Sequence, residues 1–131
     1  MFSTSILASL ALLPNLQLQS KSTQIILMQQ IYDDYKRFQM DLEFVQLLAN
    51  PQYIYQLAIK QYFEDDQFVN YLQYLLYFKR PEFLKYIKYP VCIKMLDCLQ
   101  NEEFRLQMKD RNFADKISKQ IEVTFQILQS K

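Results

Sequence analysis

A chain of 131 residues, half of them apolar, is long enough for one domain with a sizeable core and too short for two. Its 15 basic and 14 acidic residues leave a net charge of +1, which argues against general nucleic-acid binding, because that binding needs a surplus of positive charge. Glycine and histidine are both absent, which excludes glycine-rich phosphate loops and removes the commonest general base and metal ligand.

The N-terminal region carries a short apolar patch at residues 6–13, followed by Pro14. The patch is similar to the core of a secretion signal, but no basic residue precedes it, and it is too short to cross a bilayer. We expect residues 1–34 to form an N-terminal extension that is partly helical, with Thr23 capping a helix that begins at Gln24. A small secreted or membrane-associated helical protein that uses the apolar patch is the alternative function.

Helical periodicity is clear over residues 35–49, where an apolar stripe repeats every three or four residues. The helix before it either continues into this one or breaks once near Asp33–Asp34. Asn50 ends the helix, because a residue before proline is pushed out of the α region, and Pro51 then opens a helix that continues to Gln61. The residues of the stripe are Phe38, Leu42, Val45 and Ala49.

A turn rich in acidic residues follows at residues 62–66. Asp65 or Asp66 is well placed to cap the next helix, whereas a calcium loop of the EF-hand type would need spaced ligands and a glycine, which are missing. Residues 68–78 are apolar on most sides, which is typical of a buried central helix. The narrow polar stripe of this helix consists of Asn70, Gln73 and Tyr77.

Two prolines mark the corners that follow the central helix. Pro81 opens a short helix, and the Tyr89-Pro90 step repeats the arrangement before a helix that begins at Val91. Cys92 and Cys98 are six positions apart on that helix and point about 240° apart, so they suit neither a disulfide nor a shared metal. We expect both to be buried, reduced thiols.

The helical pattern weakens after residue 101 and returns near the C-terminus, where apolar residues recur almost every four positions. The sequence therefore predicts an all-α fold, a compact bundle of four to five core helices with additional N- and C-terminal helices. We divide the chain into an N-terminal extension (1–34), a helical core (35–110) and a C-terminal amphipathic helix (111–131). The apolar residues of that last helix are Phe113, Ile117, Ile121, Phe125 and Leu128.

Little catalytic chemistry is available, because the serines and threonines lack a histidine partner. Glu43, the one carboxylate within a strongly apolar helix, could act as an acid or base if it were buried, but we expect it to lie at the helix rim or to pair with Arg37 or Lys36. We predict that the chain is not an enzyme and has no cofactor. Its ten tyrosines and ten phenylalanines favour a contact surface instead, since aromatic grooves bind proline-rich extended segments. Phe68 and Tyr71 are assigned to the core. The candidate partner-binding residues are Tyr74, Tyr77, Phe78, Pro81, Tyr86, Tyr89 and Pro90.

Two blocks carry a family resemblance, LEFVQLLANPQYIYQLA at residues 42–58 and the block at residues 62–99, especially FVNYLQYLLYFKRPEFLKYIKYPVCIKMLDCL. Together they resemble the family of Mediator complex subunit 31, the small helical subunit of the RNA polymerase II coactivator. The sequence departs from the usual pattern of that family at Phe78, where tryptophan is usual, and at Gln61, where glycine is usual.

The resemblance implies a non-enzymatic scaffold subunit of the Mediator middle module, located in the nucleus, that supports the regulation of RNA polymerase II transcription. In that family the helical bundle holds the N-terminal, proline-rich segment of Mediator subunit 7 in extended form. The implied partners are therefore that segment and other middle-module subunits, with RNA polymerase II reached indirectly. Neither a direct sequence-specific contact with nucleic acid nor a membrane contact is expected.

Overall fold

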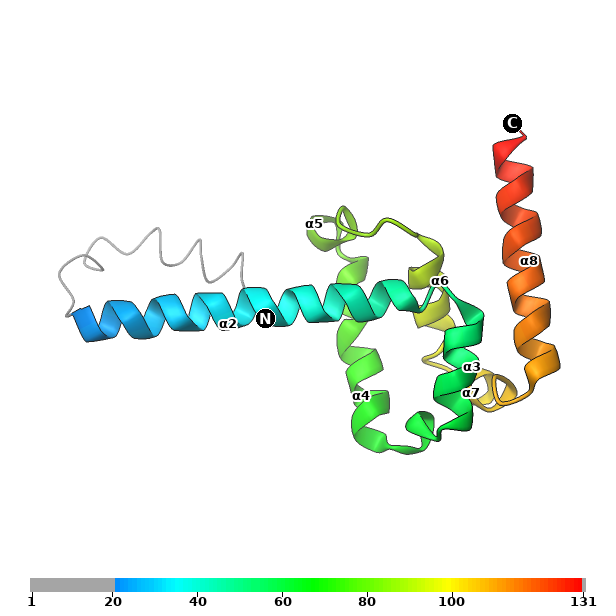
Figure 1. The fold of residues 1–131 in the computed structure, drawn as a ribbon, viewed down its shortest axis with the longest axis horizontal. Coiled ribbons are helices and arrows are strands. Elements are labelled where there is room, and N and C mark those ends of the chain that lie inside the picture. Colours follow the sequence, from blue (N-terminus) through cyan, green and yellow to red (C-terminus); the bar gives the residue numbers. More distant parts are fainter. Residues whose placement is uncertain (1–20, 131) are drawn as a thin grey trace. The chain divides into compact units, whose positions relative to one another are not determined.

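The structure of the chain, a computed structural model, describes residues 21–130, and its regular elements there are all helices (Figure 1). This confirms the predicted all-α fold class. The chain divides after Asp41 into two units. Across the described range, no helix combines the length and the apolar character that crossing a membrane requires. The apolar patch at residues 6–13 lies outside the described residues.

Helix α2 (Lys21–Leu47) runs without interruption. It already includes the residues before Gln24, so the prediction that Thr23 caps a helix start is wrong. The break considered near the paired aspartates does not occur either, because side-chain bonds one turn apart support the helix there. Gln30 Nε2 donates to Asp34 Oδ1 at 3.0 Å, and Gln29 Nε2 donates to Asp33 Oδ1 at 3.1 Å. Such pairs stabilise a helix by about 0.2–0.5 kcal/mol each.

Two capping side chains begin the next helices. Asn50 Oδ1 accepts a hydrogen bond of 3.0 Å from the backbone N–H of Gln52 and so caps the start of α3 (Pro51–Ile59). Asp65 Oδ1 makes the equivalent bond at 2.9 Å and starts α4 (Asp66–Tyr74). A short 3-10 turn, η2 (Tyr62–Glu64), connects them. Both caps follow from local side-chain chemistry. The cap by Asp65 was predicted, whereas for Asn50 only the end of the preceding helix was predicted and its capping bond was not.

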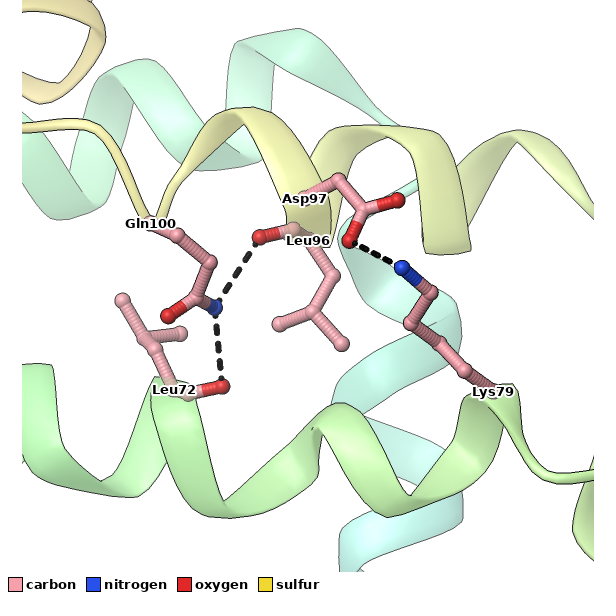
Figure 2. A network of polar contacts seen from close by, with 5 residues as sticks. All are labelled: Leu72, Lys79, Leu96, Asp97 and Gln100. Atoms are coloured by element: carbon pink, nitrogen blue, oxygen red, sulfur yellow. Dashed lines mark hydrogen bonds and ion pairs between the residues drawn. The ribbon is translucent and has the colours of Figure 1, made fainter.

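The central helix changes pitch where α4 passes into a 3-10 helix, η3 (Leu75–Lys79). Backbone bonds reach four residues back in an α-helix and three in a 3-10 helix, so a change of pitch can leave a nearby carbonyl for another donor. Gln100 Nε2 donates to the Leu72 carbonyl at 3.0 Å and to the Leu96 carbonyl at 3.1 Å (Figure 2). The Gln100 side chain thereby joins the central helix to α6 (Val91–Cys98).

The proline corners have the predicted form. Pro81 opens α5 (Pro81–Leu84), and Pro90 directly precedes α6. Helix α7 (Glu102–Gln107) was not predicted, because six residues make fewer than two turns and cannot show a clear periodicity. Its start is nevertheless defined by Asn101, whose side chain accepts from the N–H two residues on at 2.7 Å.

The predicted C-terminal amphipathic helix is present as α8 (Arg111–Gln129), which packs along α3 (Figure 1). Gln52 Nε2 donates to Asp115 Oδ1 at 2.9 Å and to Ser118 Oγ at 3.3 Å, which fixes the first half of α8 on α3. Further along the helix the apolar residues are exposed, and Leu128 retains 64% of its accessible surface.

The core of the second unit is centred on α4 and η3, as predicted for this stretch. Leu72, Leu75 and Phe78 follow at three-residue spacing and are all fully buried. Both cysteines are free thiols, and burial raises the pKa of the Cys92 thiol to about 11, whereas Cys98 is only half-buried. The largest fully buried side chains are Phe78, Leu48, Ile54, Leu72, Leu75, Leu96, Leu99, Met108, Val45 and Cys92.

Candidate partner-binding surface

No group of three or more Cys, Asp or Glu side chains within residues 21–130 is arranged to hold a metal ion. Glu43, the carboxylate considered as an acid or base, is exposed on α2, as expected for a residue at the helix rim. The second unit instead carries a series of aromatic rings that contact one another.

Aromatic rings form a continuous series in the second unit, which we call the aromatic row. Phe44 on α2 lies at its middle, with ring centroids 5.9 Å from Phe68 and 5.6 Å from Tyr71. Tyr62 extends the series at one end, 5.4 Å from Phe68, and Tyr74 at the other, 5.9 Å from Tyr71. Tyr62 is 47% exposed and the other four residues are half-buried, so the row is partly accessible to solvent.

The sequence of α4 explains the course of the row. Phe68, Tyr71 and Tyr74 follow at three-residue spacing, and each step of three turns about 60° short of a full turn in an α-helix. The rings therefore wind gradually around the helix beside the buried leucines. Because neighbouring rings pack in tilted, stacked or edge-to-face pairs, each restricts the rotamer of the next. The rings of the row consequently hold one another in fixed positions.

Tyr77 differs from its predicted position in the polar stripe, since it is only 6% exposed. The change to 3-10 pitch alters the direction of the side chains after Tyr74. The corner at Pro81 then brings Phe83 onto the Tyr77 ring, edge to face at 5.0 Å. Phe78 is fully buried and stacks against Tyr77 at 4.4 Å. These two predicted binding residues support the surface from beneath.

The other predicted binding residues remain accessible. Tyr74 is half-buried and contacts the Tyr77 ring at 5.3 Å. Both prolines of the corners are exposed, and so are Tyr86 at 47% and Tyr89 at 58%. The predicted set thus separates into a buried pair, one member of the aromatic row, and four exposed residues of the α5–α6 region: Pro81, Tyr86, Tyr89 and Pro90.

Sequence reasoning missed part of the row. Phe68 and Tyr71 were assigned to the core and are instead half-buried, and Phe44 and Tyr62 were not considered as contact residues. The three-residue spacing of rings from Phe68 onward was a signal that could have shown a continuous aromatic edge. No local signal places Phe44 there, because its contacts come from packing between elements distant in sequence.

Backbone bonds hold the loop that carries the exposed tyrosines. The Lys88 N–H donates to Gln46 Oε1 at 3.0 Å, which fastens the loop to the last turns of α2. The Tyr86 N–H donates to the Phe83 carbonyl at 3.1 Å, and the Tyr89 carbonyl accepts from Cys92 N–H at 2.9 Å. Tyr86 and Tyr89 therefore stand on a fixed backbone.

Comparison with known proteins gives one consistent family. The Med31 family model, described as SOH1, matches residues 35–129, a range that contains the whole aromatic row and the α5–α6 loop. Residues 21–34 of α2 lie outside that match.

Among curated proteins, the chain is similar to "Mediator of RNA polymerase II transcription subunit 31" of Schizosaccharomyces pombe, with 41% identity over 95 residues, or 72% of this chain and 68% of the relative. It is also similar to subunit 31-B of Xenopus laevis, with 61% identity over 84 residues, or 64% of this chain and 65% of the relative. The Arabidopsis thaliana subunit 31 is 53% identical over 73 residues, which are 56% of this chain and 37% of the relative.

Proposed function

Since this chain belongs to the Mediator subunit 31 family, we propose that it is a non-enzymatic scaffold subunit of the Mediator middle module, acting in the nucleus in the regulation of RNA polymerase II transcription. Its scaffolding role is to hold the N-terminal, proline-rich segment of Mediator subunit 7 in extended form. Other middle-module subunits are further partners, and RNA polymerase II is reached indirectly.

The observation that carries this proposal is the aromatic row. A proline-rich segment in polyproline II form has little conformational entropy to lose, and its pyrrolidine rings pack well on aromatic faces. One turn of that helix rises about 9 Å, whereas neighbouring rings of the row lie 5.4–5.9 Å apart. Prolines on successive turns would therefore meet different rings. This supports an extended ligand along the row better than a single-residue pocket.

The exposed corner residues extend the proposed contact. Tyr86 and Tyr89 lie on the backbone that Gln46 anchors to α2, the same helix that contributes Phe44 to the row. We propose that a long segment contacts the row through its prolines and continues to the loop. The start of the family match at residue 35 also supports residues 1–34 as an extension, with binding assigned to the core (35–110) and residues 111–131 as the C-terminal helix.

The test is a binding titration of the full chain with the N-terminal segment of subunit 7 from the same organism. Hot-spot aromatic residues commonly contribute about 1–3 kcal/mol each, so Tyr71→Ala/Tyr74→Ala should weaken binding at least about tenfold. Tyr71→Phe/Tyr74→Phe keeps both rings and should bind within about threefold of the wild type.

The matched control for this titration is Tyr32→Ala/Tyr35→Ala, which removes two exposed tyrosines of α2 that lie outside the row. It should leave affinity unchanged. Circular dichroism establishes that each variant is folded. If a folded Tyr71→Ala/Tyr74→Ala variant bound as tightly as the wild type, the proposed use of the row would be wrong.

A further inference from the structure

The segment that carries Tyr86 and Tyr89 also holds a strong local excess of positive charge. Residues 79–94 include five of the 15 basic residues of the chain but only one of its 14 acidic residues, Glu82. The remainder of the chain therefore carries ten basic and 13 acidic residues. A nearly neutral protein thus has its positive charge concentrated around α5 and the loop that follows.

Most of these cations are available for a partner. Lys79 Nζ forms an ion pair with Asp97 Oδ1 at 3.0 Å (Figure 2). This bridge brings the end of η3 to the face of α6 on which Lys94 lies, three residues before Asp97. The remaining cations of the segment are exposed and form no ion pair with any described residue; they are Arg80, Lys85, Lys88 and Lys94.

Cations and tyrosines follow closely along this segment, whose loop has a fixed backbone. Lys85 Nζ lies 5.4 Å from the centroid of the Tyr86 ring, which places a cation and an aromatic face side by side. The Lys88 N–H bond to Gln46 Oε1 and the Ile87 N–H bond to the Leu84 carbonyl, both of 3.0 Å, hold the loop. Because the backbone is already ordered, a ligand would lose little affinity to loop ordering on binding. We call this the basic loop surface: Arg80, Lys85, Tyr86, Lys88, Tyr89 and Lys94.

We propose that the basic loop surface binds an acidic protein segment in which aspartate or glutamate side chains lie beside prolines. The proposal rests on the proposed function and specifies the chemistry of the part of the ligand that passes the loop. Lysine and arginine would pair with the carboxylates, while the exposed tyrosine rings would pack on the prolines. Complementary charge of this kind speeds association and fixes the direction of the segment.

Charge favours an acidic peptide over a nucleic acid. Tight phosphate-backbone binding commonly uses about six to ten cationic contacts, whereas this surface offers four unpaired cations. A long polyanion would also meet the remainder of the chain, where acidic residues are in excess. A short acidic segment matches both the size and the charge of the surface.

The experiment titrates the full chain with two synthetic proline-rich peptides. One carries glutamates in its C-terminal half, and the other has every glutamate replaced by glutamine. The glutamate peptide should bind about tenfold tighter at low salt, and this advantage should shrink as salt screens the charges. Lys85→Glu/Lys88→Glu should abolish the advantage. Lys116→Glu/Lys119→Glu makes the same change of charge at exposed positions of α8. This control variant should still bind the glutamate peptide more tightly than the glutamine peptide.

Equal affinities for the two peptides, or the same loss in both lysine variants, would overturn the inference. Glutamine-peptide binding that is lost in Tyr71→Ala/Tyr74→Ala would then still support the proposed function. The reverse result, with the charge effect present and the tyrosine variant unaffected, would sink the proposed function and leave this inference in place. Tighter binding of a poly(dT) oligonucleotide, lost in Lys85→Glu/Lys88→Glu, would reassign the surface to nucleic acid.

Discussion

Gln61 occupies an unusual backbone conformation for a residue with a side chain. Its φ of 68° lies in the left-handed region, and no other described residue has positive φ. The turn between α3 and η2 requires this geometry, which costs a non-glycine residue about 1–2 kcal/mol because Cβ approaches the following carbonyl oxygen. The resemblance noted from the sequence has glycine as the usual residue here, and the conformation of Gln61 explains why.

Replacing Gln61 with glycine should therefore stabilise the protein. We expect Gln61→Gly to raise the free energy of unfolding by roughly 0.5–1 kcal/mol, since relief of the steric cost exceeds the added entropy of the unfolded chain. Urea denaturation measures the change. As a control, Gln56→Gly on an exposed position of α3 should lower stability by about 1 kcal/mol. A destabilising Gln61→Gly would contradict the account of this turn.

Cys92 makes stability depend on pH in a predictable direction. Its pKa rises from 9.0 to about 11 in the folded protein because burial disfavours the thiolate. Between these values the unfolded chain loses the proton while the folded chain keeps it, so stability falls as pH rises. Over that range wild-type stability should fall by about 2–3 kcal/mol more than that of Cys92→Ala. Cys98→Ala should retain the steep fall, and parallel curves for wild type and Cys92→Ala would refute this explanation.

At the scale of elements, one side chain that follows α6 contacts the central helix close to its change of pitch. The Leu72 carbonyl is satisfied by Gln100, which also bonds the Leu96 carbonyl. Arg105 Nη1 similarly donates to the Leu99 carbonyl at 2.8 Å. Side chains that follow α6 therefore donate hydrogen bonds to main-chain carbonyls of the central helix and of the end of α6.

Removing the Gln100 side chain should lower the free energy of unfolding by more than an ordinary surface substitution does. Gln100→Ala leaves two part-buried carbonyls without the amide donor, so we expect a loss of about 1–3 kcal/mol in unfolding free energy. Gln107→Ala, at an exposed position of α7, should change stability by less than about 0.5 kcal/mol. Thermal and urea unfolding of the two variants measure the difference. Equal effects would show that the Gln100 bonds contribute nothing specific.

The same elements show how far sequence reasoning reaches. The starts of α3, α4 and α5 were predicted, because Asn50, Asp65 and Pro81 act through bonds or torsions within a few residues. The burial of Tyr77 was not predicted, because it depends on the 3-10 helix η3 and on the contact with Phe83, which follows the corner at Pro81. Contacts between distant elements, such as Phe44 with Phe68, leave no periodic trace in the chain.

At the scale of the whole molecule, the second unit carries both surfaces to which we assign binding. Its buried helices form the support, the aromatic row lies on α2, η2 and α4, and the basic loop surface surrounds α5. Family membership was predictable from the sequence blocks, because they include these supporting residues and corners. The partial exposure of these rings could be seen only in the structure. The same aromatic residues would look no different in the sequence if they were fully buried in the core.

The most direct test of the central claim is the accessibility of individual tyrosines, measured by hydroxyl-radical footprinting of the full chain with and without the subunit 7 segment. We predict that Tyr62, Tyr71 and Tyr74 become protected in the complex, whereas Tyr77, already buried, changes little. A stable complex in which the three tyrosines of the row stay as reactive as in the free chain would contradict the assignment of the row as the binding surface.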